Sequence, residues 1–379
     1  MTGTFAAIGF VVTIVVVILI HEAGHFLMAR KFDIKVEEYF LGFGPKLWST
    51  RSGETEYGVK AIPLGGYVKI AGMNPFLEPL EEDLPRTYGA KPIWQRSLVI
   101  LAGPVTHFAL AFVVLVLYLG VVGQPSRYSA AITEVQSQLN GHTSPAAAAG
   151  LRPGDVVVSV NGHPADVDNF IGFTRADTDG TPLVLVVRRD GEEVTVSATP
   201  EMATLEGQTR PFLGISLSPG AVLSRDKSGF FGSFKDAGVV FWSGVTQVFD
   251  SFARVFGPEG IGRLFRLVFG HAQRSTGDAV SMVGAARIAS QAADAGQFDA
   301  FVALFVSINL FVGLLNLVPL PPFDGGHLAT LAIEKLRHGQ KVDMRRMIPV
   351  TAVVAALLIT FMVAVVYLDF VKPVPNLFP

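Results

Sequence analysis

Long hydrophobic segments alternate with polar stretches along this chain of 379 residues. Four of them span residues 1–30, 97–122, 300–320 and 348–370, close to the roughly 20 residues that cross a bilayer core as a helix. They predict a multi-pass α-helical membrane protein with four transmembrane helices embedded in the lipid bilayer. The first segment has no basic leader and no evident cleavage site, so we expect it to remain as a span rather than to be a signal peptide.

The composition agrees with a membrane protein. Half of the residues (50%) are hydrophobic and 16% are charged, whereas soluble proteins average about 25% charged residues. The formal net charge of −2 gives no reason to expect a nucleic acid as partner. Cysteine is absent, which excludes disulfides and any thiol ligand or nucleophile.

Basic residues in the short connections predict the orientation of the chain. Because cytoplasmic loops carry an excess of Lys and Arg, the basic connection 321–347 is expected in the cytoplasm. The connection 31–96 is then cytoplasmic too, while both termini and the segment between the second and third spans lie outside. The predicted location is the cytoplasmic membrane. The basic residues that carry this prediction in the later connection are Lys335, Arg337, Lys341, Arg345 and Arg346.

A metal-binding pattern lies at the end of the first hydrophobic segment. His21 and His25 are four residues apart, so on a helix both imidazoles project from one face and can bind one metal ion. Glu22 lies between them in the H-E-x-x-H arrangement, which is typical of a zinc site with glutamate as general base. Polar groups are costly within a membrane span, which favours a functional site over a chance match.

A catalytic zinc ion usually has three protein ligands, so a third ligand is expected. The strongest candidate is Asp324, in the sequence that follows the third span, where prolines stop the helix and two glycines allow a tight turn. Non-helical backbone at membrane depth is tolerated where it is buried in protein or lines a watery cavity. The alternatives are that Asp324 is only a turn residue, or that His327 or His107 is the ligand.

These motifs, in this order, resemble the site-2 proteases, a family of intramembrane zinc metalloproteases, in the bacterial branch that has one PDZ domain. The resemblance implies that Zn²⁺ is bound by His21, His25 and Asp324, with Glu22 as catalytic base. The family motif N-x-x-P-x-P matches Asn316, Pro319 and Pro321, which the resemblance implies help to hold the substrate backbone. Asn316 could instead form a hydrogen bond between helices.

Two positions differ from the family pattern. Phe323 precedes the Asp-Gly pair where Leu is common, and His107 ends the run Ala102–His107 where Asn is common. The first is a hydrophobic exchange, whereas the second could change the polarity near the site. The family implies single-span membrane protein substrates, such as anti-sigma factors that have already been trimmed outside the membrane, and an active site toward the cytoplasmic side.

Residues 31–96 contain a glycine-rich β-hairpin with a turn at Ser52-Gly53. The resemblance implies that this hairpin is associated with the membrane and pairs with an unwound substrate segment, with Gly65 and Gly66 among the substrate-binding residues. This is physically reasonable, because a helix hides its carbonyls and must be extended before water can attack. The alternative is a hairpin that only stabilises the surface.

Strands and one helix over residues 125–220 predict an inserted extracytoplasmic α+β domain. The run Gly150-Leu151-Arg152-Pro153-Gly154-Asp155 resembles a PDZ domain, and we expect Gly150, Leu151 and Gly154 at its peptide groove. The domain could bind peptide ends by strand addition, or could only exclude untrimmed substrates by size. Residues 221–299 are predicted as an amphipathic helical region that lies in the membrane interface or packs on its neighbours.

The sequence thus predicts an intramembrane zinc metalloprotease that hydrolyses peptide bonds in or near transmembrane segments. Two other classes remain open. A metal transporter or sensor would have further polar groups in the fourth span, where residues 350–366 contain only Thr351 and Thr360. A catalytically silent PDZ scaffold would have lost one of the motif residues, and none is lost.

Overall fold

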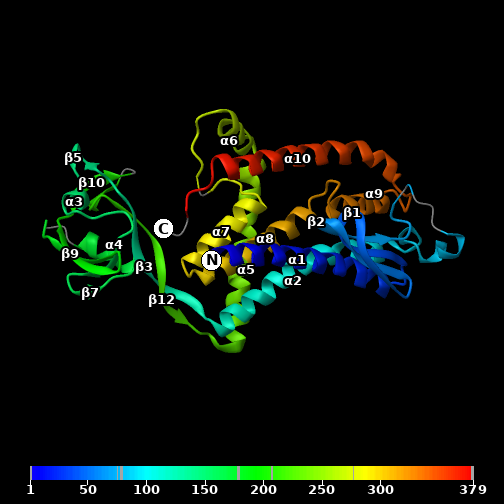
Figure 1. The fold of residues 1–379 in the computed structure, drawn as a ribbon, viewed down its shortest axis with the longest axis horizontal. Helices are drawn as coiled ribbons and strands as arrows, with labels where there is room; N and C mark the ends of the chain where they lie inside the picture. Colours follow the sequence, from blue (N-terminus) through cyan, green and yellow to red (C-terminus); the bar gives the residue numbers. More distant parts are fainter. Residues whose placement is uncertain are drawn as a thin grey trace. The chain divides into compact units, whose positions relative to one another are not determined.

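The computed structural model describes residues 2–74, 76, 80–176, 180–205, 208–275 and 277–376. Within these ranges, four helices are long and apolar enough to cross a membrane: α1 (Thr2–Lys31), α2 (Ile93–Val121), α8 (Phe298–Asn316) and α10 (Ile348–Val371). They coincide with the four predicted segments and fit a multi-pass membrane protein. The chain divides into two compact units, Met1–Leu117 with Lys235–Phe378, and Tyr118–Phe234 (Figure 1).

The predicted hairpin is present in the first unit. Strands β1 (Val36–Ser52) and β2 (Thr55–Ile70) pair antiparallel around a turn at Gly53, whose φ of +64° is readily adopted by glycine. The base of the hairpin joins a buried apolar cluster with α1 and α2, which fixes it beside the end of α1 that carries the histidines. The buried members are Phe26, Ala29, Ile34, Val36, Ile70, Tyr88, Val99 and Ile100. Short 3-10 helices η1 (Glu81–Arg86) and η2 (Tyr88–Ala90) lead into α2.

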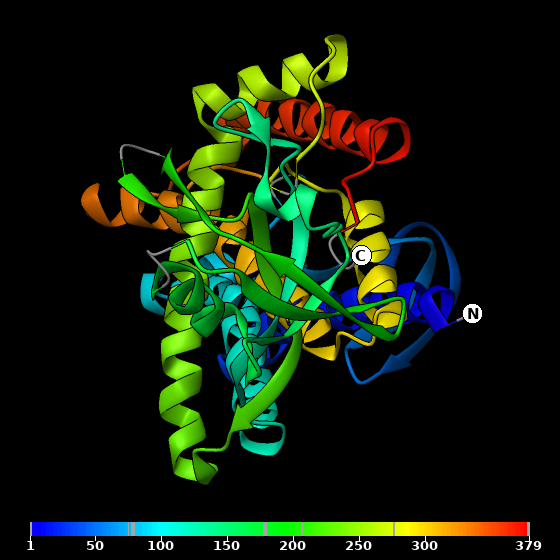
Figure 2. The ribbon, with the colours of Figure 1, turned by 90° about the vertical axis from the view of Figure 1, so that its left-hand side faces the viewer.

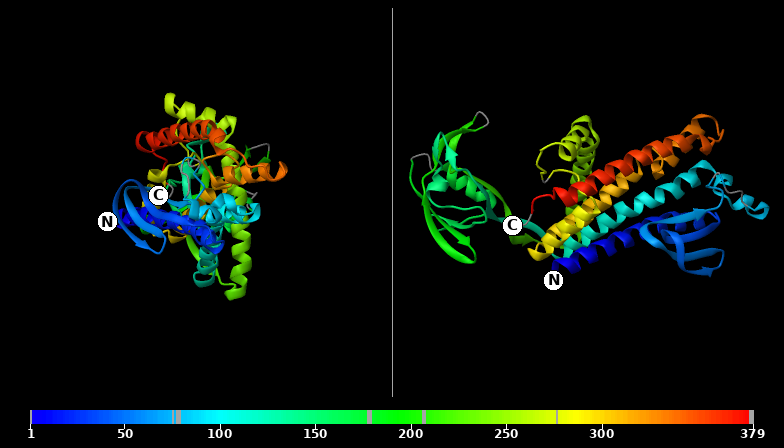
Figure 3. Two further views of the ribbon diagram at one scale, coloured as in Figure 1. Left: turned by 90° about the vertical axis from the view of Figure 1, so that its right-hand side faces the viewer. Right: turned by 45° about the horizontal axis from the view of Figure 1, so that its top comes forward.

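The connection predicted as a loop over residues 321–347 contains a further helix, α9 (Asp324–Leu336). Helix α8 ends at Asn316, because the prolines that follow cannot continue it. The chain then turns tightly, and the new helix begins at Asp324 and includes both glycines that follow it. The 3-10 helix η3 (Met344–Met347) leads into α10. Figure 3, in its right-hand view, shows the axes of α1 (blue), α2 (cyan) and α10 (orange to red) roughly aligned, with α1 running opposite to the other two.

Three helices make up the predicted amphipathic region: α5 (Gly229–Phe256), α6 (Pro258–Phe269) and α7 (Met282–Asp294). The aromatic stripe of α5 packs in part on the spans. Phe252 stacks on Phe311 of α8 with ring centroids 4.7 Å apart, and Phe256 lies 5.1 Å from Phe361 of α10. Trp242 remains exposed on the same helix. The structure therefore supports ordinary packing for the end of the stripe.

The second unit is an antiparallel sheet with strand order β12-β3-β6-β8-β9, with β7 paired to β6, and with helix α4 packed against it. Figure 2 shows these strands in green, facing the viewer. Strand β12 continues to Asp226, beyond the predicted domain limit at residue 220. The elements are β3 (Gln124–Val135), β4 (Gln138–Leu139), β5 (His142–Thr143), α3 (Pro145–Ala148), β6 (Val156–Val160), β7 (His163–Pro164), α4 (Val167–Ala176), β8 (Leu183–Arg189), β9 (Glu192–Ala198), β10 (Glu201–Leu205), β11 (Gln208–Phe212) and β12 (Ile215–Asp226).

Local sequence explains the turns of this sheet. Asn161-Gly162 joins β6 to β7 and Asp190-Gly191 joins β8 to β9, and all four residues have φ between +51° and +90°. Asn-Gly and Asp-Gly are favoured in two-residue hairpin turns, because both central residues must adopt positive φ.

The turn before β6 is fixed by a buried ion pair. Asp155, whose side chain is 1% exposed, accepts hydrogen bonds from Arg189 Nε and Nη2, both at 2.7 Å, and from the backbone N–H of Arg152 at 2.9 Å. Burial alone would raise the pKa of Asp155, but the hydrogen bonds from Arg189 and Arg152 outweigh it and hold the pKa below its usual range.

We predict that Asp155→Asn destabilises the second unit by about 2 kcal/mol at pH 7, because it removes the charge that holds the partly buried guanidinium of Arg189. Since the folded-state pKa is lowered, this stability is present above the unfolded value of about 3.9 and is lost as pH falls through the folded pKa. The difference in the free energy of unfolding between wild type and variant should therefore be constant above about pH 5 and should decrease below about pH 4. Urea unfolding of the full chain in detergent measures this, with Glu193→Gln as an exposed control. An unchanged midpoint at pH 7 would contradict the prediction.

Candidate metal centre

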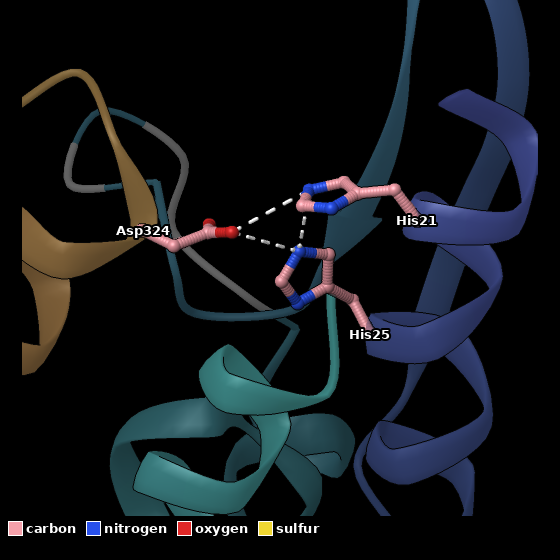
Figure 4. A group of neighbouring side chains, drawn as sticks. All are labelled: His21, His25 and Asp324. Atoms are coloured by element: carbon pink, nitrogen blue, oxygen red, sulfur yellow. Dashed lines mark hydrogen bonds and ion pairs between the residues drawn. The ribbon is translucent and has the colours of Figure 1, made fainter. Parts of the chain in front are cut away.

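Two distant parts of the first unit bring three side chains together. His21 and His25 project from the same face of α1, and Asp324 is the first residue of α9 (Figure 4). The Nε2 atoms of the two histidines are 3.2 Å apart. Asp324 Oδ2 lies 3.4 Å from Nε2 of His21 and 3.3 Å from Nε2 of His25. In the described part of the chain, these residues form one group whose atoms could hold a metal ion.

Hydrogen bonding supports a cation at the point where these atoms meet. The Nδ1–H of His25 donates to the carbonyl of Val99 at 2.8 Å, so in neutral His25 the Nε2 atom carries a lone pair. Asp324 Oδ2 is buried and has no hydrogen-bond partner among the described residues. An acceptor nitrogen and a carboxylate oxygen facing each other at this distance repel unless a proton or a metal ion lies between them. Two imidazoles and one carboxylate are the ligand set of many catalytic zinc sites.

Glu22 is on α1 and contacts the hairpin, outside the group of three. Its carboxyl group is hydrogen bonded to the backbone of Val68 on β2. Its Cγ is 3.3 Å from the place where a Cβ at Gly66 would lie, so β2 approaches Glu22 closely because residue 66 has no side chain. Gly65, with φ of +121°, packs beneath the ring of Phe43. The structure thus places Gly66 next to the predicted base, and Gly65 next to Phe43 within the hairpin.

A glycine of α2 that was not predicted as a site residue is in direct contact with the histidines. A Cβ at Gly103 would lie 2.2 Å from Nε2 of His25 and 2.7 Å from Cε1 of His21. Any side chain at this position would displace the rings. Gly24 in turn lies against the carbonyl of Ala102, where a Cβ would be 2.5 Å from the oxygen. The signal in the sequence was a glycine within the span beside Pro104, but a sequence alone does not say which face of α2 meets α1.

His107 and His327 were the rival ligands, and neither joins the group of three. The buried His107 ring lies 5.0 Å from that of His21, and its Nδ1 is 3.2 Å from Oδ1 of the buried Asn309 on α8. The departure from the family pattern at residue 107 therefore adds a polar pair beside the site rather than a ligand. Phe323, the second departure, is the N-cap residue of α9 and makes no side-chain capping bond.

The remaining predicted residues of the third span lie just before Asp324. Asn316 is the last residue of α8, and Pro319 and Pro321 lie in the connection to α9. The glycines after Asp324 lie in the first turn of α9 and let it pack closely on this connection. A Cβ at Gly325 would lie 2.3 Å from the carbonyl oxygen of Val318, and one at Gly326 would lie 2.6 Å from the backbone of Pro321.

In the second unit, the structure does not bring the predicted groove residues to a cavity. Leu151 is buried in the core, and Gly150 and Gly154 adopt positive φ in the turn before β6. A cavity of about 200 Å³ lies elsewhere, between α4 and the strands β11 and β12. The Gly-Leu-x-Pro-Gly-Asp run builds a turn and a core contact, and the assignment of Gly150, Leu151 and Gly154 to a peptide groove stays a prediction. The cavity is lined by Phe170, Ile171, Thr174, Arg210, Pro211, Phe212, Leu213, Ile215 and Leu217.

A group of two histidines and one carboxylate with an adjacent glutamate, on helices long enough to cross a membrane, defines a membrane-embedded metallopeptidase. The chain belongs to peptidase family M50, whose model matches residues 9–361. This confirms the resemblance to site-2 proteases, and the protein is an intramembrane zinc metalloprotease that uses Zn²⁺.

Proteins similar to this chain match it over most of its length. Zinc metalloprotease Rip1 of Mycobacterium tuberculosis is 33% identical over 96% of this chain and 97% of its own. A putative zinc metalloprotease of Nostoc sp. is 32% identical over 86% of this chain and 85% of its own. A solved PDZ domain of an SdrC-like protein from Listeria innocua covers 25% of this chain and 98% of that domain at 17% identity. Its TM-score of 0.21 is too low to assign the fold of the second unit.

We predict that Gly103→Ala lowers peptide cleavage about 100-fold, because the added methyl group displaces the imidazoles from Asp324 by a distance that catalysis does not tolerate. Zinc content after dialysis against a weak chelator should fall in parallel. Gly9→Ala is the matched control, since an added Cβ at this helical glycine of α1 meets nothing within 4 Å. Wild-type zinc retention in Gly103→Ala would show that the rings do not need this space.

Proposed function

We propose that His21, His25 and Asp324 hold the zinc ion and that Glu22 is the catalytic base. The observation that carries this proposal is the convergence of two imidazole nitrogens and one carboxylate oxygen within 3.4 Å of one another. The buried Asp324 Oδ2, which has no hydrogen-bond partner among the described residues, supports it further.

The zinc ion supplies Lewis acidity that polarises the scissile carbonyl and acidifies water. Glu22 takes the proton from the attacking water and later returns a proton to the leaving nitrogen. The contact of Glu22 with β2 at Gly66 and Val68 limits the directions in which its carboxylate can point. His25 keeps its orientation through the Val99 carbonyl.

We propose that the substrate is held as an extended strand beside this machinery. Gly65 and Gly66 offer backbone free of side-chain bulk at the part of β2 that reaches Glu22. Asn316, Pro319 and Pro321 would contact the substrate backbone from the other side, since the connection that contains the prolines leads directly to Asp324. An extended segment exposes the carbonyl that a helix keeps in its own hydrogen bonds.

The substrates we propose are single-span membrane proteins of the anti-sigma-factor type, trimmed outside the membrane before cleavage. The second unit would then lie outside the cytoplasm and either bind the new peptide end or exclude untrimmed substrates. Its apolar cavity beside α4 favours peptide binding, because such a cavity can receive a side chain of a peptide added to the sheet edge. The excess of basic residues in the connections supports an active site toward the cytoplasm.

We predict that Glu22→Gln lowers cleavage of a pre-trimmed single-span substrate in detergent by about 100-fold to 10,000-fold, because the amide cannot accept the proton. Zinc content should stay at the wild-type level, since Glu22 is not one of the three ligands. His25→Ala and Asp324→Ala should lose zinc as well as activity. Cleavage by Glu22→Gln at the wild-type rate would exclude Glu22 as base. Zinc-loaded wild type that cuts no tested substrate would favour a silent scaffold.

We predict the sidedness from single cysteines, which can be introduced freely because the natural chain has none. In intact cells, a membrane-impermeant maleimide should label Glu192→Cys in the second unit and leave Ser52→Cys at the hairpin turn unlabelled. Both positions are exposed, so both should react once the membrane is opened. Labelling of both cysteines in intact cells, or of Ser52→Cys alone, would contradict the proposed orientation.

A further inference from the structure

A buried ion pair joins α9 to α2 close to the metal centre. Arg96 Nη1 donates to Glu334 Oε2 at 2.9 Å, and Nη2 donates to Glu334 Oε1 at 2.5 Å. Both side chains are 7% exposed. The Arg96 guanidinium also lies over the ring of Tyr88, 5.8 Å from its centroid. This two-bond geometry fixes the direction as well as the distance between the helices.

The position of the pair connects it to two of the three proposed ligands. Glu334 is in the last turn of α9, the helix that begins with Asp324. Arg96 is in the first turn of α2, one helical turn before Val99, whose carbonyl holds the His25 imidazole. The same end of α2 therefore contacts a ligand of α1 directly and the helix of the third ligand through the ion pair.

Asp324 depends on α9 for its position, because Oδ2 has no hydrogen-bond partner among the described residues. The N-cap residue of α9, Phe323, makes no side-chain hydrogen bond either. At the start of the helix, Gly325 packs against the end of α8. At its other end, Glu334 is the charged side chain that is held by a buried partner. A small rotation of α9 would move the carboxylate away from the two imidazoles.

The orientation of the charges is unfavourable for each helix by itself. A cation in the first turn of α2 and an anion in the last turn of α9 both oppose the helix dipoles. Burial of each charge is also unfavourable without its partner. The gain therefore lies in the contact between the two helices rather than in the stability of either one.

We propose that Arg96 and Glu334 are positioning residues of the metal centre, which hold α9 on α2 so that Asp324 Oδ2 meets Nε2 of His21 and His25. This inference rests on the proposed assignment of Asp324 as a zinc ligand. It goes beyond that assignment by naming the contact that sets the position of the ligand.

The test compares zinc release and kinetics in purified full-length protein. Glu334→Gln keeps the shape of the side chain and removes its charge. We expect zinc transfer to a chromogenic chelator to become at least about tenfold faster, in the range seen when groups that orient metal ligands are changed. We expect kcat to fall by a similar factor while KM for the substrate stays within about twofold, because no substrate contact is removed. The double variant Arg96→Glu/Glu334→Arg restores the charge pair in the direction that suits both helix dipoles, and it should recover most of the zinc retention.

A burial-matched control separates positioning from general stability. Arg274 and Asp369 form an ion pair in which both side chains are 1% exposed, between the segment before α7 and the end of α10. Asp369→Asn should lower the melting temperature without faster zinc release. Equal zinc release in Asp369→Asn and Glu334→Gln would overturn the proposal, as would wild-type zinc release in Glu334→Gln. If Asp324→Ala retains zinc, Asp324 is not a ligand and the proposed metal site is wrong. Measuring zinc in Asp324→Ala therefore distinguishes failure of the ligand assignment from failure of the positioning proposal.

Discussion

The convergence of His21, His25 and Asp324 sets conditions that the surrounding helices must meet. Three groups that bind metal through lone pairs lie within 3.4 Å of one another in a largely buried place, an arrangement that is unfavourable without a cation. A Zn²⁺ ion bound by the three groups, as we propose, would resolve this conflict, provided that the backbone does not let the groups separate. The space at Gly103 and the carbonyl of Val99 then follow as requirements of the site.

Helix α2 contributes no proposed ligand, yet it contacts both histidines and the helix that carries Asp324. Arg96, Val99 and Gly103 are spaced by three and four residues, so they share one face of the helix. Along this face, one residue holds α9, one orients an imidazole and one leaves room for both rings. The role of α2 is to serve as a common support for two ligand-bearing helices that are far apart in sequence.

The grouping of His21, His25 and Asp324 could be predicted because its signal is local, while their assignment as the zinc ligands stays a proposal. His21 and His25 are one helical turn apart, and the prolines and glycines around Asp324 mark a turn at the end of a span. Gly103 and the Arg96–Glu334 pair could not be predicted, because their roles depend on which faces of separate helices meet. Helix α9 was missed since the prolines and basic residues around it are also typical of a loop. The groove residues of the second unit stay a prediction, because a turn motif indicates a turn and not the position of a cavity.

The hairpin is fastened to α1 at the turn that precedes the catalytic motif. The Tyr39 hydroxyl donates to the carbonyl of Leu19 at 2.6 Å, and burial raises the pKa of Tyr39 to about 12, so this donor keeps its proton throughout the physiological pH range. This bond from β1 and the contact between Glu22 and Gly66 on β2 together fix the hairpin relative to the base. A substrate strand that pairs with the hairpin would therefore be aligned with Glu22 by the same contacts that hold the hairpin. Pairing would thus both extend the substrate segment and place it beside the base.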